Sequence, residues 1–255
     1  MTPAELAQKL KNLTDAPLLE ARWILKEIQD ENKINRLVLR RQRGEPLSKI
    51  LGHKGFWKGD FLTSKDVLDP RADSETLIQA VLQTFSDNNA PYSFLDIGTG
   101  SGCLLISLLT EYQKAKGTGI DVSDKALRIA RKNATKNHIK ARFLKQDMRN
   151  INDSFDFAVS NPPYIATKDI EKLDKNVRLY DPLLALDGGT DGLNYYRILS
   201  QIQTIPWLFL EIGKGQKTAI CQIFKTNKWR LVSTYKDIGK ITRVLVFQKK
   251  TCKRK

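Results

Sequence analysis

Hydrophobic residues recur at helical spacing near the start of this chain. The spacing predicts three helices, over residues 4–13, 16–28 and 33–42. In the second of them, Leu18, Leu19, Trp23 and Ile24 are expected to face inward. The sequence therefore predicts a small N-terminal helical region, which we place at residues 1–44.

The pattern changes after this region. A Gly-Glu-Pro sequence at 44–46 interrupts the helical spacing. Residues 47–69 then show short β-like pieces around Gly52, Gly55 and Gly59, which predict a hairpin linker at 45–69.

From Pro70 to residue 255, strand-length apolar runs alternate with helical segments. The predicted strands are 92–95, 116–122, 141–146, 155–160, 207–212, 229–235 and 242–248. Alternation of this kind is typical of a parallel sheet covered by helices. The last two strands are close in sequence and are joined by a turn at Gly239. We therefore expect an α/β, Rossmann-like domain at 70–255, with seven strands and an antiparallel last strand.

The most informative motif is Asn161-Pro162-Pro163-Tyr164, directly after a predicted buried strand. Two prolines end the strand, because neither can donate an N–H and both restrict φ. The turn would aim the Asn161 side-chain oxygen and the Pro162 carbonyl at one point, with the Tyr164 ring beside them. Two acceptors so placed suit a planar NH2 group, such as an amide or the exocyclic amine of a base. An ordinary proline-rich turn is the alternative interpretation.

A glycine-rich turn lies between the 92–95 strand and the next apolar helix. It reads Asp96-Ile97-Gly98-Thr99-Gly100-Ser101-Gly102. A strand, a glycine turn and a helix form the cofactor-binding corner of a doubly wound sheet. A nicotinamide fingerprint would require glycine at position 103, which is Cys103. This spacing, and the acid that precedes it, favour S-adenosylmethionine, with Asp96, Ile97, Gly98, Thr99 and Gly100 as cofactor-binding candidates.

Acids also end the next two predicted strands. Asp121 follows Gly100 by 21 positions, where a carboxylate can accept both ribose hydroxyls. The capping role at the following helix suits Ser123 or Asp124 better. Asp147 and Met148 follow the third strand, where Asp147 could accept an adenine amine and Met148 could pack on the ring. Simple core packing is the alternative for Met148.

Composition narrows the class of protein. No run of 18 apolar residues is present, so we expect no membrane span. The three cysteines are far apart and the two histidines lie in unrelated settings, so neither a metal site nor a disulfide framework is expected. Free cysteines and the lack of an apolar leader indicate a reducing cytoplasm. We expect a monomer.

The chain is strongly basic, with a formal net charge of +15. Between Lys114 and Lys145 there are ten Lys or Arg residues and two acids, and the chain ends in a basic run. This balance favours a polyanionic or acidic partner. A codon bias toward lysine would produce the same surface without any such partner.

These motifs together resemble the PrmC/HemK family of protein-(glutamine-N5) methyltransferases, which modify class I peptide-chain release factors. The resemblance runs from about Arg40 to Lys249. Besides the motifs above it rests on 44–47, 50–52, 56–57, 68–75, 119–123, 180–182, 185–189, 191–193, 210–213 and Gln216. It implies a class I S-adenosylmethionine-dependent methyltransferase fold. It also implies methyl transfer to the glutamine of the release factor's Gly-Gly-Gln loop.

The resemblance assigns roles to particular residues. It implies that Asn161, Pro162 and Tyr164 are catalytic, and that Pro163 helps them bind the glutamine. Asn161 would also touch the cofactor. Arg71 and Glu75 resemble family residues near the cofactor pocket, with a structural ion pair as the alternative. We interpret Glu211, at the end of a strand, as structural.

Three departures from the family pattern are visible. Ala72 and Ser74 replace the usual Pro and Thr, Asp181 replaces a usual Glu, and the N-terminal helical region is shorter than usual. In the family that region helps to grip the release factor. Methylation of an exocyclic amine on DNA adenine or rRNA is the alternative function. Nucleic acid is nevertheless not expected as the substrate, since no added target-recognition domain is visible.

Overall fold

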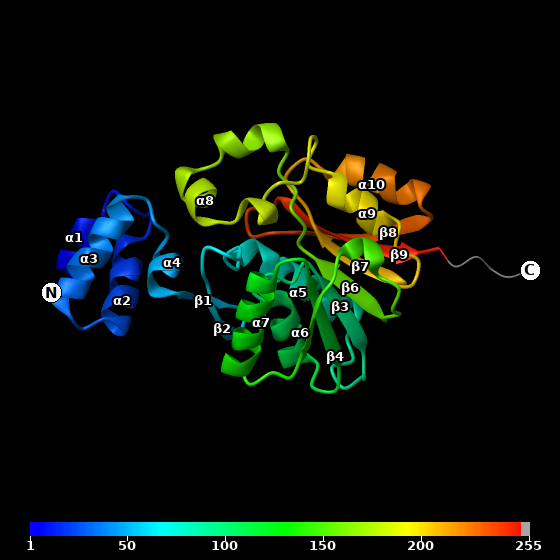
Figure 1. The fold of residues 1–255 in the computed structure, drawn as a ribbon, viewed down its shortest axis with the longest axis horizontal. Coiled ribbons are helices and arrows are strands. Elements are labelled where there is room, and N and C mark those ends of the chain that lie inside the picture. The colour runs from blue at the N-terminus through cyan, green and yellow to red at the C-terminus, as the bar shows by residue number, and fades with distance from the viewer. Residues whose placement is uncertain (251–255) are drawn as a thin grey trace, which may run out of the picture.

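The computed structural model describes residues 1–250, and Cys252 and the rest of the terminal basic run lie outside the described residues. A helical unit and a larger α/β domain lie side by side (Figure 1). The helical unit comprises α1 (Pro3–Leu10), α2 (Pro17–Glu27), α3 (Glu31–Gln42) and α4 (Leu47–Leu51).

Local sequence signals start the first helices where they are observed. Thr2 and Glu5 form a capping box on α1, and Asp30 accepts two backbone N–H groups at the start of α3. The unit has its own apolar core, built around Leu6, Ile24 and Leu37. Leu18 and Leu19 do not join it.

The inward orientation predicted for Leu18 and Leu19 is therefore wrong. Their side chains are 45% and 70% exposed. The inward orientation predicted for Ile24 is confirmed, and Trp23 is partly buried against the same core. The buried stripe of α2 passes through Ala21 and Ile24, because that face meets the other helices.

A short helix and a hairpin connect the two parts. The helix α4 was not expected, since five residues are too few to show helical periodicity. It forms because Leu47, Ile50 and Leu51 pack against the core of the helical unit. The predicted hairpin follows as β1 (His53–Phe56) and β2 (Gly59–Leu62), which pair antiparallel. Phe56 and Phe61 enter the core of the α/β domain.

The α/β domain is built on one seven-stranded sheet. The strands are β3 (Ser93–Ile97), β4 (Lys116–Asp121), β5 (Arg142–Lys145), β6 (Phe157–Ser160), β7 (Trp207–Glu211), β8 (Trp229–Lys236) and β9 (Thr242–Lys249). Their order is β5-β4-β3-β6-β7-β9-β8, and β9 is antiparallel to both of its neighbours. The predicted sheet with an antiparallel last strand is confirmed.

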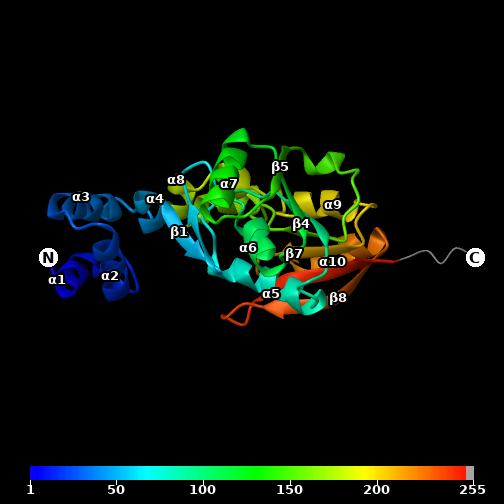
Figure 2. The ribbon, with the colours of Figure 1, turned by 90° about the horizontal axis from the view of Figure 1, so that it is seen from below.

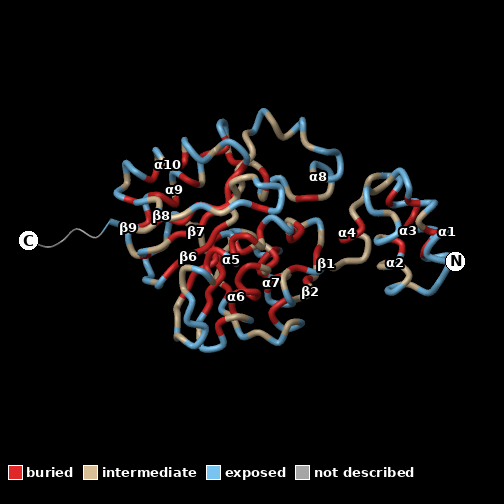
Figure 3. The backbone as a smooth tube through the Cα atoms, turned by 180° about the vertical axis from the view of Figure 1, so that it is seen from behind, coloured by how far each residue is buried: buried red, intermediate tan, exposed pale blue. Residues whose placement is uncertain are grey.

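Helices cover both faces of this sheet (Figures 1 and 2). On one face lie α5 (Glu75–Thr84), α6 (Cys103–Glu111) and α7 (Asp124–Lys136), and on the other α9 (Asn194–Ser200) and α10 (Lys217–Thr226). Buried residues concentrate in the strands and on the inner faces of the helices (Figure 3).

An excursion between β6 and β7 reaches the helical unit. It contains η3 (Thr167–Lys172), α8 (Lys175–Tyr180) and η4 (Leu183–Ala185). An added Cβ at Gly44 would lie 2.7 Å from Asn176 Oδ1, so α8 lies against the end of α3. Within residues 1–250, no helix is long and apolar enough to cross a membrane.

Candidate active site

The predicted motifs meet at the carboxyl edge of the parallel strands. Ile97, the last residue of β3, pairs with Ile120 on β4 and with Ser160 on β6. The strand order reverses between β3 and β6, and ligands bind at such switch points in open α/β sheets. A cavity of about 380 Å³ lies there, within the size range of small-molecule sites.

Most of the predicted site residues line this cavity. These are Ile97, Gly98, Thr99, Gly100, Asp121, Asp147, Met148, Asn161, Pro162 and Pro163. Asp96 and Tyr164 are not among the lining residues.

The glycine turn forms the floor of the cavity beside β4. Gly98 and Thr99 donate their N–H groups to the Ile120 carbonyl, which holds the turn on the neighbouring strand. Gly98 has φ +73°, and an added Cβ would meet no protein atom within 4 Å. This position therefore leaves open space where a ligand can approach the backbone.

Asp121 faces the same space from the end of β4. Its two oxygens accept the N–H groups of Gly100 and Ser123, both at 2.9 Å. Each carboxylate oxygen has a further lone pair for a ligand hydroxyl. Burial raises the pKa of Asp121. Ser123, not Asp121, caps α7 by accepting the Ala126 N–H.

Asp96 lies underneath the turn. It is the fourth residue of β3 and is 1% exposed, because the strand extends two residues further than the apolar run 92–95 indicates. Thr99 Oγ1 donates to Asp96 Oδ2 at 2.6 Å. Burial raises the pKa of Asp96 to about 7. The carboxyl group thus holds the turn from below.

The residues that follow β5 also line the cavity. Asp147 accepts hydrogen bonds from the Arg149 side chain at 3.0 and 2.7 Å and from its backbone N–H. The Arg149 hydrogen bonds lower the pKa of Asp147. Met148 lines the cavity and also packs against the core on the α9 side of the sheet.

The Asn161 amide has a defined orientation. Its Nδ2 donates to Ser74 Oγ at 3.1 Å, so its Oδ1 is the atom left to accept from a ligand. Pro162 and Pro163 line the cavity next to it. The Tyr164 side chain lies behind them, partly buried, and burial raises its pKa to about 12. Ser74, the residue at which the chain departs from the family's Thr, therefore orients the predicted catalytic asparagine.

Residues outside the Asn161–Tyr164 motif hold its turn in place. Gln216 Nε2 donates to the Tyr164 carbonyl at 2.8 Å, and its Oε1 accepts the Gly213 N–H. The loop at 187–192 packs directly on the turn, because the Gly188 N–H donates to the Ile165 carbonyl at 2.8 Å and Gly188 lies close to Pro163. The family resemblance included residues of this loop and Gln216 but assigned them no role. Glycines at 188, 189 and 192 and the Gln at 216 were the available signal.

Arg71 and Glu75 both bond to other parts of the protein. Arg71 Nη2 donates to Asp181 Oδ2 at 2.6 Å, and Arg71 also lines the cavity. Glu75 accepts the Trp57 N–H at 2.8 Å and does not line the cavity.

Glu211 is buried beside the asparagine turn. Leu210 on β7 pairs with Ser160 on β6, so Glu211 lies next to Asn161 at the strand ends. It is 1% exposed, and burial raises its pKa to about 7, against the opposing effects of Ser74 and Arg243.

This raised pKa predicts a pH-dependent stability. A glutamate in the unfolded chain has a pKa of ~4.3. The native state therefore holds an extra proton between that pH and about 7, and this contribution to stability is lost as pH rises through 7. We expect Glu211→Gln to reduce the fall in unfolding free energy from pH 5.5 to 8.5 by about 1–3 kcal/mol. Denaturant unfolding at both pH values measures it.

The exposed Glu171→Gln is the matched control, and it should leave the pH dependence unchanged. A pH dependence in Glu211→Gln equal to that of the wild type would contradict the prediction. Asp96 contributes with the same sign and remains in both variants.

Comparisons with known proteins identify relatives of this chain. Residues 63–177 match the family model of the methyltransferase small domain. The release factor glutamine methyltransferase of Caulobacter vibrioides is 41% identical, over 84% of this chain and 76% of the relative. That of Agrobacterium fabrum is 36% identical over 96% of both chains.

Solved structures share the fold at low sequence identity. The hMettl16 catalytic domain, solved with an RNA hairpin, aligns with a TM-score of 0.62 at 15% identity, over 94% of this chain and 84% of that one. A methyltransferase from Pyrococcus furiosus aligns with a TM-score of 0.56 at 18% identity, over 87% and 100%.

The sheet order, the glycine turn and the acid at the end of β4 define a class I S-adenosylmethionine-dependent methyltransferase fold. Within that class, the chain belongs to the release factor glutamine methyltransferase family.

Proposed function

We propose that this chain transfers the methyl group of S-adenosylmethionine to the N5 atom of the glutamine in the Gly-Gly-Gln motif of class I release factors. The single observation that carries the proposal is the Asn161 amide, whose Nδ2 is held by Ser74 while its Oδ1 is left at the cofactor cavity. The names of the relatives support the substrate.

The cavity suits this cofactor. Gly98 leaves open space at the backbone, and Asp121 offers oxygens for two ribose hydroxyls. Asp147 and Met148 would flank the adenine. When bound, the cofactor supplies an electrophilic methyl group on its sulfonium.

The chain's own residues would position the nucleophile. An amide nitrogen is a poor nucleophile because its lone pair is delocalised into the carbonyl. Asn161 Oδ1 and the Pro162 carbonyl would accept its two N–H groups, orient it and stabilise the positive charge that develops on attack. Pro163 and Tyr164 would shape the slot. Such positioning can contribute about 7–11 kcal/mol.

Mass spectrometry of a purified class I release factor tests the proposal. After incubation with this protein and S-adenosylmethionine, the Gly-Gly-Gln peptide should gain the mass of one added methyl group on glutamine. A release factor with the glutamine changed to alanine is the control. Transfer to rRNA or DNA amines, with none to the release factor, would overturn the assignment in favour of a nucleic-acid substrate.

Asp121 gives a separate test of the cofactor site. Asp121→Ala removes the acceptors proposed for the ribose, and hydrogen bonds to a charged group contribute about 1.5–3 kcal/mol each. We expect S-adenosylhomocysteine to bind at least tenfold more weakly, measured by calorimetry. Asp124→Ala is the control, since Asp124 pairs with Lys145 on the surface. Equal affinity in Asp121→Ala and wild type would exclude this role.

A further inference from the structure

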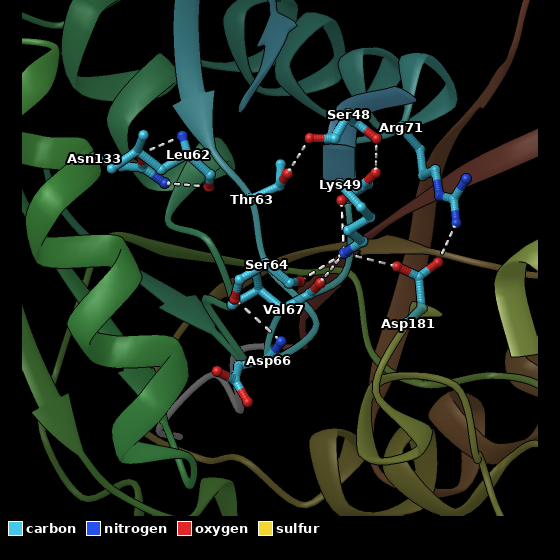
Figure 4. A network of polar contacts seen from close by, with 11 residues as sticks. Ser48, Lys49, Leu62, Thr63, Ser64, Asp66, Val67, Arg71, Asn133 and Asp181 are labelled. Atoms are coloured by element: carbon cyan, nitrogen blue, oxygen red, sulfur yellow. Dashed lines mark hydrogen bonds and ion pairs between the residues drawn. The ribbon is translucent and has the colours of Figure 1, made fainter. Parts of the chain in front are cut away.

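Lys49 is a buried cation that joins separate parts of the molecule (Figure 4). Its side chain is 4% exposed, and its Nζ lies 2.7 Å from Asp69 Oδ1 and 3.1 Å from Asp181 Oδ1. It also donates to the carbonyls of Ser64 and Val67 at 2.7 and 2.8 Å. An ammonium has three hydrogens, so its bonding capacity is used entirely inside the protein.

The partners of Lys49 lie in or directly next to two segments that line the cavity, which we call its two walls. One wall is the segment 65–71, which contains Asp69 and is continuous with Ser64. The other contains Pro182, Leu184 and Ala185, which follow Asp181 directly. Lys49 itself does not line the cavity. It therefore contacts both walls from outside the cavity.

The two carboxylates depend on this cation. Asp69 and Asp181 are almost fully buried, and among the described residues Lys49 is the paired cation of Asp69 and shares Asp181 with Arg71. Their other oxygens are occupied by Ser48 and Arg71. Removal of one partner from a buried ion pair leaves an uncompensated charge, which is strongly unfavourable. Without Lys49, Asp69 would lose its paired cation and Asp181 would keep only Arg71, so we expect both segments to be held less firmly.

Lys49 also ties the cavity to the helical unit. It lies on α4, where the neighbouring Leu47 and Ile50 pack in the core of that unit. We propose that Lys49 is a positioning residue that holds both walls of the cofactor cavity against the helical unit, so that cofactor affinity depends on the placement of α4. This rests on the proposed function, in which the cavity holds S-adenosylmethionine.

Binding of S-adenosylhomocysteine to Lys49→Met tests the proposal. We expect the dissociation constant to rise about tenfold or more, while kcat at saturating cofactor stays within about threefold. A purely structural lysine would lower the melting temperature and leave the affinity of the folded protein unchanged. Lys249→Met is the matched control, because Lys249 also donates to two backbone carbonyls, those of Ile202 and Asn227, away from the cavity.

A second, less disruptive variant tests the proposal even if Lys49→Met does not fold. Asp181→Asn keeps the size of the side chain and an acceptor for Arg71, but removes the charge that Lys49 faces. We expect it to weaken binding several-fold. Folded Lys49→Met and Asp181→Asn proteins that bind S-adenosylhomocysteine as tightly as the wild type would overturn the proposal.

Hydrogen exchange separates this proposal from the proposed function. Without any ligand, Lys49→Met should exchange faster than wild type at the amides of 64–69 and 181–187, and Lys249→Met should not. Failure of the wild type to bind S-adenosylhomocysteine would count against the proposed function, and the exchange experiment would still test the walls. Unchanged exchange at both segments would refute the role of Lys49.

Discussion

Asn161→Ala is expected to remove methyl transfer to the release factor and to leave cofactor binding nearly intact. Loss of one preorganised polar contact to developing charge costs about 10²–10³ in kcat. The alanine removes the only side-chain acceptor of the proposed pair, while Pro162 still presents its carbonyl. Single-turnover transfer, followed by mass spectrometry of the glutamine peptide, measures the effect.

The matched control for this variant is Asn227→Ala. Asn227 Nδ2 donates to a serine hydroxyl, Ser200 Oγ, as Asn161 Nδ2 donates to Ser74 Oγ, but it lies at the end of α10 away from the cavity. It should transfer methyl groups at nearly the wild-type rate. If Asn161→Ala stayed within a factor of a few of wild type, the acceptor mechanism would be wrong.

Gly192→Ala is expected to disrupt the site by displacing the turn at Asn161–Tyr164. Gly192 has φ +75°, and an added Cβ would lie 2.4 Å from the Tyr164 carbonyl oxygen and 2.9 Å from Gln216 Nε2. These two atoms form the 2.8 Å hydrogen bond that supports the asparagine turn. The methyl group would therefore push the turn out of position. We expect at least a tenfold loss of kcat, since small misplacements of reacting groups are costly.

Gly215→Ala separates this displacement from backbone strain. Gly215 has φ +85°, but an added Cβ there would meet no atom within 4 Å. Both variants lose about 1–2 kcal/mol from the left-handed backbone, and only Gly192→Ala should lose about 1–3 kcal/mol more by overpacking. Denaturant unfolding and initial rates compare them. Equal losses in the two variants would show that Gly192 does not support the turn.

Local motifs made much of the site predictable. The Gly98 turn and the Asn161 turn are each encoded within a few residues that follow a strand. Parallel strands bring their carboxyl ends to one edge, so Asp121 and Asn161 had to meet once the strands were known. The antiparallel last strand followed from the short connection between β8 and β9.

It was harder to predict which residues of the motifs line the cavity. Asp96 and Tyr164 belong to the motifs, yet neither lines the cavity. Asp96 was expected at a strand end, and β3 extends past it to Ile97. A motif specifies the order of residues along a turn, and the packing of the next layer decides which of them reach the ligand.

The sequence by itself determined the order of the strands along the chain, the chemistry of the two turns and the family of the protein. Only the tertiary structure decided that Ser74 orients Asn161, that Gln216 and Gly192 support the turn, and that Lys49 joins Asp69 to Asp181. Those contacts join residues far apart in the chain, and no periodicity or local motif encodes them. They arise when the buried surfaces of separate elements are packed together and each buried polar group must find a partner.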